Sequence, residues 1–246
     1  MTAPRTLCVD VGGSAIKAAV LSRVELDGDH LRVPTPYPLT PTDLADAIAS
    51  IGEQLHGYDR ASVGFPGLVR AGRIVTAPFF IRPAGWGSAV SDALRDVWIG
   101  LDLQDLLATR LGRPVLVAND ADVAGAGIVD GCGLEVVITL GTGFGSGVFL
   151  DGEVCPHLEL AHHPLRDGES YNEHVGDAAR RAIGPDRWNE RVLVALEAVE
   201  RLLEPDRIWV GGGNARHLRH PLPPTAAVVT QHAGLIGGVR LWEPAG

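Results

Sequence analysis

The stretch Val115-Leu116-Val117-Ala118-Asn119-Asp120-Ala121-Asp122-Val123-Ala124-Gly125-Ala126-Gly127 predicts the architecture of this chain. An apolar run ends abruptly at an amide and a carboxylate, and small residues follow. This pattern is typical of a buried strand that delivers polar groups at its carboxyl end and continues into a helix. Ligands of open α/β sheets bind at such strand ends. Asp120 is therefore a candidate general base and Asn119 a candidate substrate ligand, unless both residues only cap the helix.

The composition is that of an ordinary globular protein. Of the 246 residues, 46% are hydrophobic and 21% are charged, which allows one large domain or two modest ones. No apolar run approaches the roughly 20 residues that cross a bilayer. The start of the chain, Met1–Leu7, lacks the hydrophobic region of a signal peptide. We therefore expect a cytoplasmic protein that has no membrane partner.

Charge and cysteine content exclude further classes of protein. The net charge of -9 argues against a general nucleic-acid surface. The three cysteines are Cys8, Cys132 and Cys155, which lie far apart and form no CxxC pair. Neither a disulfide framework nor a structural zinc site is expected from them. Lys17 is the only lysine, and it follows a glycine-rich turn.

That first glycine-rich turn connects two short apolar segments. Leu7–Val11 predicts a strand, Gly12-Gly13-Ser14 a tight turn, and Ile16–Leu21 a second strand. Glycine lets backbone N–H groups approach an anion closely. Ser14 adds a hydroxyl donor and Lys17 a positive charge, while Asp10 is placed to hold a hydrated Mg²⁺. The alternative is a hairpin without a ligand.

A second stretch repeats this design half a chain later. Leu134–Leu140 and Val148–Leu150 predict strands on either side of a turn with four glycines in seven residues, Gly141–Gly147. Thr142 and the backbone amides of this turn, including those of Gly143 and Gly145, would form a second anion cradle. The repetition predicts a duplicated architecture with a ligand between its halves.

The remaining segments alternate between helices, strands and polar loops. Residues 61–69 predict a strand that closes on the turn Gly64-Phe65-Pro66-Gly67, which either flanks a site or only marks the end of the strand. Residues 76–86 predict an extended loop, and the mixed-charge residues 164–191 a solvated surface. Apolar spacing predicts helices over 41–55, 90–97, 102–111, 121–129, 192–203 and 234–242.

Two further motifs carry polar groups. Glu159 and His162 lie three residues apart, so one helical turn would place both on one side, suited to sugar hydroxyls. A zinc site that adds His163 lacks a supporting HExxH or cysteine set, and an exposed polar loop is the other alternative. Residues 205–216 predict a strand that enters the triple-glycine turn Gly211-Gly212-Gly213-Asn214, a third candidate for anion or nucleotide binding.

Taken together, these segments resemble the sugar kinases of the ROK family, which have the actin-like (hexokinase/heat-shock-70) ATPase fold. The motifs that carry the resemblance are DVGGSAIK (10–17), NDAD (119–122), LGTGFGSG (140–147), ELAH (159–162) and GGGN (211–214). Within this family the chain is most similar to the polyphosphate glucokinases, for instance in its Gly64–Gly67 turn. The expected fold is α/β, ribonuclease H-like and duplicated, with one lobe of residues 1–117 plus 228–246 and another of 118–227.

The resemblance also implies roles. Asp120 would remove the proton from the 6-hydroxyl of glucose as it attacks phosphorus. Asn119, Glu159 and His162 would bind the sugar, together with the turn at Gly67. A polyphosphate or ATP donor, with Mg²⁺ held by Asp10 through water, would bind to Asp10, Gly12, Gly13, Ser14, Lys17, Gly141, Thr142, Gly143, Gly145, Gly212, Gly213 and Asn214. The resemblance further implies a homodimer.

The chain departs from the family pattern at several positions. Ala15 and Ala161 stand where the family usually has glycine, and Phe79 stands where relatives place a sugar-binding asparagine. These departures leave two alternatives open. One is an ATP-dependent ROK kinase for another hexose, and the other is a sugar-sensing protein without catalysis. Because no helix-turn-helix precedes Asp10, we do not expect a DNA-binding repressor.

Overall fold

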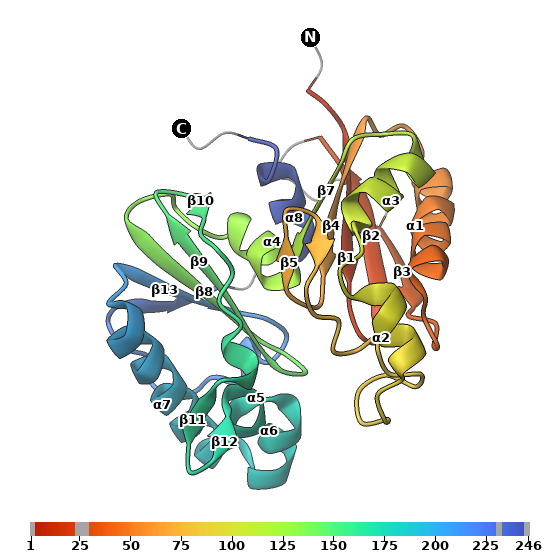
Figure 1. Ribbon diagram of the computed structural model, residues 1–246. Coiled ribbons are helices and arrows are strands. Elements are labelled where there is room, and N and C mark those ends of the chain that lie inside the picture. The colour runs from red at the N-terminus through yellow and green to blue at the C-terminus, as the bar shows by residue number, and fades with distance from the viewer. Residues whose placement is uncertain (1–2, 23–29, 230–232, 244–246) are drawn as a thin grey trace. The chain divides into compact units, whose positions relative to one another are not determined.

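The computed structural model describes residues 3–22, 30–229 and 233–243 (Figure 1). The chain divides into two compact units. The N-terminal unit comprises Met1–Gly127 with Ala233–Pro244, and the C-terminal unit comprises Ile128–His232 with Ala245–Gly246. Each unit contains one five-stranded sheet.

The sheet of the N-terminal unit has the order β3-β2-β1-β4-β7. The strands β1 (Thr6–Val11), β2 (Ala15–Leu21) and β3 (His30–Pro34) are antiparallel neighbours. On the other side of β1, the strands β4 (Arg60–Phe65) and β7 (Val115–Asn119) run parallel to it. Their carboxyl ends therefore meet at one edge, where the predicted site residues follow.

Helices cover both faces of this sheet (Figure 1). On one face lie α1 (Pro41–Leu55) and α3 (Leu103–Leu111), whose apolar side chains join the sheet in the main core. On the other face lie α4 (Asp120–Ala126) and α8 (Ala233–Arg240). The unit is completed by α2 and a small hairpin: α2 (Asp92–Trp98), β5 (Val69–Arg70) and β6 (Arg73–Ile74).

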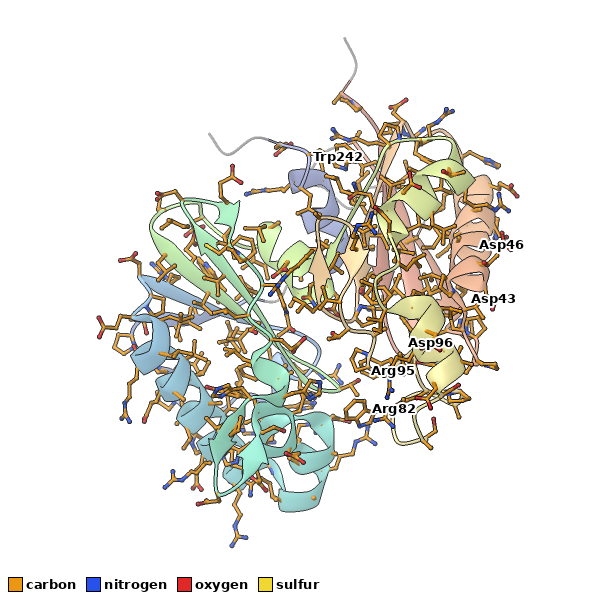
Figure 2. All side chains as sticks on the ribbon, in the orientation of Figure 1. Asp43, Asp46, Arg82, Arg95, Asp96 and Trp242 are labelled. Carbon is orange, nitrogen blue, oxygen red and sulfur yellow. The ribbon has the colours of Figure 1, made fainter. Side chains whose placement is uncertain are left out.

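Local signals explain where α1 begins. Thr40 accepts a hydrogen bond from the N–H of Asp43 (3.2 Å), and the Asp43 carboxylate accepts one from the N–H of Thr40 (3.1 Å). This reciprocal cap satisfies donors that a helix start leaves unpaired, and Pro41 supplies a favourable first residue. The cap matches the position of Asp43 at the helix end in Figure 2.

The segment that follows α8 is held against the first sheet, and Trp242 in this segment is labelled in Figure 2. Trp242 donates a hydrogen bond from Nε1 to Ser62 Oγ (2.8 Å) on β4, and the guanidinium of Arg60 lies 5.0 Å from the centre of the Trp242 ring. Ser62 Oγ in turn donates to the carbonyl of Gly238 on α8 (2.5 Å). These contacts fix α8 against the sheet beside α4.

The C-terminal unit repeats the sheet order of the first. Its order is β10-β9-β8-β13-β14. Antiparallel neighbours are β8 (Leu134–Leu140), β9 (Phe144–Leu150) and β10 (Glu153–Val154), whereas β13 (Arg207–Gly211) and β14 (Ala226–Val228) run parallel to β8. The central strand of each unit thus begins a glycine hairpin, as the sequence predicted.

Helical segments pack on this second sheet. The long helix α7 (Pro185–Leu203) contributes Trp188, Val192 and Leu196 to the second core. The other elements are η1 (Leu160–His162), β11 (Pro164–Arg166), β12 (Glu169–Ser170), α5 (Tyr171–Val175), α6 (Asp177–Ile183) and η2 (Ala215–His217), where η denotes a 3-10 helix.

Two sequence-based expectations need correction. The helix expected over 121–129 ends at Ala126, because the glycines at 125 and 127 weaken its propensity. The expectation of a solvated surface over 164–191 is wrong, since this segment holds a hairpin and three helix starts. Tyr171, His174 and Trp188 are buried there. The sequence pattern did not indicate this burial, because these residues are widely spaced among charged residues.

No helix in the described ranges is long and apolar enough to cross a membrane.

The crossing of α4 and α8 generates a stability prediction. A Cβ at Gly237 would overlap the carbonyl oxygen of Val123 and lie 2.9 Å from the nitrogen of Gly127. Both atoms belong to backbone and cannot rotate away. Gly237→Ala should therefore lower the free energy of unfolding by about 3 kcal/mol, measured by urea denaturation.

Gly52→Ala in α1 is the matched control. Its Cβ would meet only the ring of Tyr58, with the hydroxyl oxygen at 2.7 Å. This side chain can rotate, and alanine gains helix propensity, so the change should stay within about 1 kcal/mol. An equal loss of stability in both variants would contradict the close approach of α4 and α8.

Candidate active site

The transition from β7 to α4 places Asn119 and Asp120 at the carboxyl edge of the first sheet. Asn119 is the N-cap of α4, and its Oδ1 accepts hydrogen bonds from the N–H groups of Ala121 (2.7 Å) and Asp122 (3.3 Å). Its Nδ2 donates to the carbonyl of Gly67 (3.0 Å). Asn119 therefore performs the capping role and also ties the end of β7 to the turn after β4.

Asp120 is the first residue of α4 and is half-buried. Its Oδ1 accepts a hydrogen bond from the N–H of Ala121 (2.9 Å). A Cβ at Gly64 would lie 3.3 Å from the Cα of Asp120, so glycine lets the helix start close beside β4. The side chain of Asp120 thus occupies a defined position at the edge where ligands of such sheets bind.

The turn at Gly67 is shaped by close backbone contacts. A Cβ at this position would overlap the carbonyl oxygen of Thr76. The hydroxyl of Thr76 accepts a hydrogen bond from the N–H of Leu68 (2.9 Å). The structure therefore brings Gly67, Asn119 and Asp120 together, as expected if they form one site.

The first glycine turn is anchored through its carbonyl groups. Thr35 donates from Oγ1 to the carbonyl of Gly12 (2.7 Å) and from its N–H to that of Ser14 (3.2 Å). Tyr37 donates from its hydroxyl to the carbonyl of Gly13 (2.8 Å). Because C=O and the following N–H point in opposite directions across a trans peptide, the N–H groups of Gly13 and Ser14 face away from these anchors.

Asp10 and Lys17 face one another across this hairpin. They are paired residues of β1 and β2, and Lys17 Nζ lies 2.9 Å from Asp10 Oδ2. Half of the Lys17 side chain is exposed. The pair places one carboxylate and one ammonium beside the turn whose amides are directed outward.

The second glycine turn is anchored in the same way. Asn214 donates from its N–H to the carbonyl of Leu140 and from Nδ2 to that of Gly141, both at 2.9 Å. The N–H of Asp177 donates to the carbonyl of Thr142 (3.2 Å). By the same peptide geometry, the N–H groups of Thr142 and Gly143 face away from their anchors.

Two residues on helices, Asn172 and Asp177, make further contacts at this turn. The N–H of Phe144 donates to Asn172 Oδ1 (2.6 Å), and a Cβ at Gly143 would lie 2.5 Å from that oxygen. Asp177 Oδ1 accepts a hydrogen bond from Asn214 Nδ2 (3.2 Å). The structure thus joins the turn at 141–143 with the turn at 211–214, whereas Gly145 lies within β9, paired with Thr139.

Gly212 is required by the backbone of the third turn. Its φ is +88°, and a Cβ would overlap the carbonyl oxygen of Leu140. Gly213 is exposed and has no atom within 4 Å of an added Cβ. The third turn therefore packs tightly at Gly212 and presents backbone to solvent at Gly213.

Glu159 is the N-cap of the single 3-10 turn η1, and His162 is the last residue of this turn. His157, which the sequence reasoning did not single out, lies with Nε2 3.7 Å from Glu159 Oε2, and its side chain is 4% exposed. Burial raises the pKa of Glu159, but the hydrogen bond from His157 and the charges of His157 and His162 outweigh it, so this pKa is lowered overall. Glu159 is therefore held ionised, as an acceptor of hydrogen bonds.

Other residues of this region were missed because they lie in the mixed-charge segment. The buried His174 donates from Nδ1 to Glu169 Oε2 (2.7 Å), and Arg191 donates to the same oxygen (3.0 Å). Among the described residues, no group of three or more His, Cys, Asp or Glu side chains is arranged to hold a metal ion.

Comparison with known proteins assigns these motifs to a family. The model of the ROK family matches residues 6–159. The polyphosphate glucokinase of Mycobacterium leprae (strain TN) is 30% identical over 93% of this chain and 72% of its own length. That of Mycobacterium tuberculosis (strain ATCC 25618 / H37Rv) is 29% identical over 93% of this chain and 88% of its own length.

Solved structures agree with the sequence relatives. The inorganic polyphosphate/ATP-glucomannokinase from Arthrobacter sp. strain KM superimposes with a TM-score of 0.78 at 31% identity, covering 95% of this chain and 96% of that one. A ROK family glucokinase from Streptomyces griseus, in complex with glucose and AMPPNP, has a TM-score of 0.71 at 21% identity, covering 96% and 98%. The predicted α/β fold of the actin-like ATPase class is confirmed, and the chain belongs to the ROK family.

Proposed function

We propose that this protein is a sugar kinase that transfers a phosphoryl group to the 6-hydroxyl of glucose. Inorganic polyphosphate is the favoured donor and ATP the second. The substrates named for its relatives support this proposal, because the mycobacterial proteins are polyphosphate glucokinases and the Arthrobacter protein is a polyphosphate/ATP-glucomannokinase. The protein would act in the cytoplasm as a homodimer.

The position of Asp120 is the observation that carries the chemistry. A half-buried carboxylate stands at the carboxyl edge of the sheet, on a helix start fixed by the Asn119 cap and the Gly67 carbonyl. As general base, Asp120 would take the proton of the attacking hydroxyl, which makes the oxygen a better nucleophile. Asn119, Glu159, His162 and the Gly67 turn would hold the sugar, with ionised Glu159 accepting a hydrogen bond from a sugar hydroxyl.

The anchored glycine turns support phosphoryl transfer from a polyanion. In each turn protein groups take up the carbonyls, so consecutive amide N–H groups point to the opposite side. Such amides stabilise phosphate oxygens without reorganising. We propose that the donor binds at Gly12, Gly13, Ser14 and Lys17 in the first turn, and at 141–145 and 212–214 in the second unit.

Asp10 fits the outer ligand of a Mg²⁺ ion that accompanies the donor phosphates. It offers a carboxylate at 24% exposure, of which Oδ2 contacts Lys17. Mg²⁺ keeps several waters and is held by one or two carboxylates together with substrate phosphates. The ion would offset the negative charge of the phosphoryl group during its transfer, whereas Lys17 would contribute a fixed positive charge at the same turn.

A kinase for another hexose is the second candidate, favoured by Phe79. A Cβ at Gly13 would lie 2.6 Å from Phe79 Cδ1, so the ring packs directly on the first glycine turn. Its centre is also 5.6 Å from that of Trp86. The resemblance implies a sugar-binding asparagine at this position, and a ring in its place would change the shape and polarity offered to the acceptor.

Donor and acceptor assays test the proposed reaction. Purified protein with Mg²⁺ should form glucose 6-phosphate from glucose and polyphosphate at a higher kcat/KM than with ATP. Turnover with mannose or an N-acetylhexosamine but not with glucose would show that the second candidate, a kinase for another hexose, is correct. No product from either donor across the hexose panel would reject catalysis and leave a sugar-sensing protein.

A single carboxylate substitution tests the base. Asp120→Asn keeps the size of the side chain but cannot accept the proton, so kcat should fall by about 10²–10⁴-fold. The Kd for the sugar, measured calorimetrically, should change little. Asp96→Asn on the exposed face of α2 (Figure 2) is the matched control and should retain full turnover. A normal rate in the Asp120 variant would refute its assignment as base.

A further inference from the structure

Three arginines gather around His217 in the C-terminal unit. Arg216 donates from Nε to His217 Nε2 (3.3 Å), and both residues belong to η2. The pKa of His217 is lowered by loss of hydration and then by the charges of Arg180, Arg216 and Arg219, while Asp177 acts in the opposite sense. We refer to Arg180, Arg216, His217 and Arg219 as the arginine cluster.

This cluster is joined to the second glycine turn by hydrogen bonds. Arg180 on α6 donates from Nη2 and Nε to Asp177 Oδ1 (2.7 and 3.0 Å). The same oxygen accepts from Asn214, which also holds the carbonyl of Gly141. Thr142, Gly212 and Gly213 are exposed beside these contacts. Hydrogen bonds therefore connect the backbone of the second glycine turn, through Asn214 and Asp177, to the guanidinium group of Arg180.

The cluster carries more positive charge than its neighbours neutralise. Asp177 is shared by Arg180 and Arg181, the latter at 2.5 Å. Arg219 lies 3.9 Å from Asp186, and both side chains are largely exposed. Within the described residues Arg216 forms no ion pair with a carboxylate. A local positive excess in a chain of net charge -9 points to an anionic ligand.

We infer that the arginine cluster binds the tail of a linear polyphosphate donor, the run of phosphates that extends beyond the glycine turns. This inference rests on the proposed function. Guanidinium groups bind phosphate oxygens in a bidentate manner. The charge of ATP ends with its three phosphates, whereas the charge of polyphosphate continues along the chain and needs cations further out.

Nucleic acid fits this surface less well. Its backbone needs a basic stripe over a larger area, while the cluster consists of three arginines and one histidine, placed on α6, in η2 and just after η2. A free chain of phosphates has no bases to accommodate and can follow a short path of arginines.

Direct binding measures the inference independently of turnover. Arg216→Gln/Arg219→Gln removes two exposed charges, so the Kd for long-chain polyphosphate should rise by about tenfold or more. The Kd for tripolyphosphate and ATP should change less than about twofold, because these donors end at the turns. An equal weakening for all three, or no weakening, would overturn the inference.

The control double variant removes the same charge elsewhere. Arg201 and Arg240 are exposed in the last turns of α7 and α8. Arg201 lies at the opposite end of α7 from Asp186, which faces Arg219. Arg201→Gln/Arg240→Gln should leave polyphosphate binding unchanged. A matching loss in this control would show that only net charge matters and would overturn the inference.

The pKa of His217 reports where the polyanion binds. Saturating long-chain polyphosphate should raise this pKa in an NMR titration, because phosphate charge offsets the repulsion from the three arginines. Binding without a change in this pKa would place the polyanion elsewhere and reject the cluster. Equally tight binding of a single-stranded oligonucleotide would identify nucleic acid, and not polyphosphate, as the ligand.

The outcomes separate this inference from the proposed function. If the protein binds polyphosphate through the cluster but transfers no phosphoryl group to any hexose, the proposed function fails and the assigned polyanion surface stands. If it phosphorylates glucose from ATP but does not bind long-chain polyphosphate, the inference fails and the sugar kinase remains.

Discussion

The geometry of the trans peptide at two glycine turns is the constraint on which the candidate donor site depends. Thr35 and Tyr37 hold the carbonyls of Gly12, Gly13 and Ser14, and Asn214 and Asp177 hold those of residues 140–142. Each captured carbonyl turns the next N–H to the opposite side. Two unrelated sets of side-chain and backbone donors thus hold the carbonyls of the two turns in the same way. The duplicated sheets place each turn after a central strand, which explains why this orientation recurs.

The β7–α4 junction imposes a second constraint on the site. Asn119 satisfies the first N–H groups of α4 and ties the helix start to Gly67. Gly64 leaves room for the backbone of Asp120 beside β4, and Gly237 lets α8 cross close behind α4. The helix-cap and functional interpretations of Asn119–Asp120 are therefore compatible. Asn119 caps α4 and ties it to Gly67, and Asp120 presents a carboxylate at the end of β7.

Local patterns made much of this predictable. The glycine hairpins and the capped α1 follow from residues that lie a few positions apart, and such signals are visible along the chain. The anchors of the turns were not visible, since Thr35 binds a carbonyl 23 residues away and Asn214 one 73 residues away. Asn172, Asp177 and His174 were hidden in a stretch whose many charges suggested a solvated surface. Each of them forms a hydrogen bond with a residue on another element: Asn172 with Phe144, His174 with Glu169, and Asp177 with Asn214.

The fold class, the repeated strand–turn–strand design and the membership in the ROK family could be read from the amino-acid sequence. These depend on the order of apolar, glycine and polar residues, which alternate with the periods of strands and helices. Three features became visible only in the folded chain: the groups that hold the turns, the pairing of Glu159 with a buried His157, and the arginines near His217. Convergence of residues distant in sequence arises from packing and strand order, and a linear pattern of residue types does not contain it.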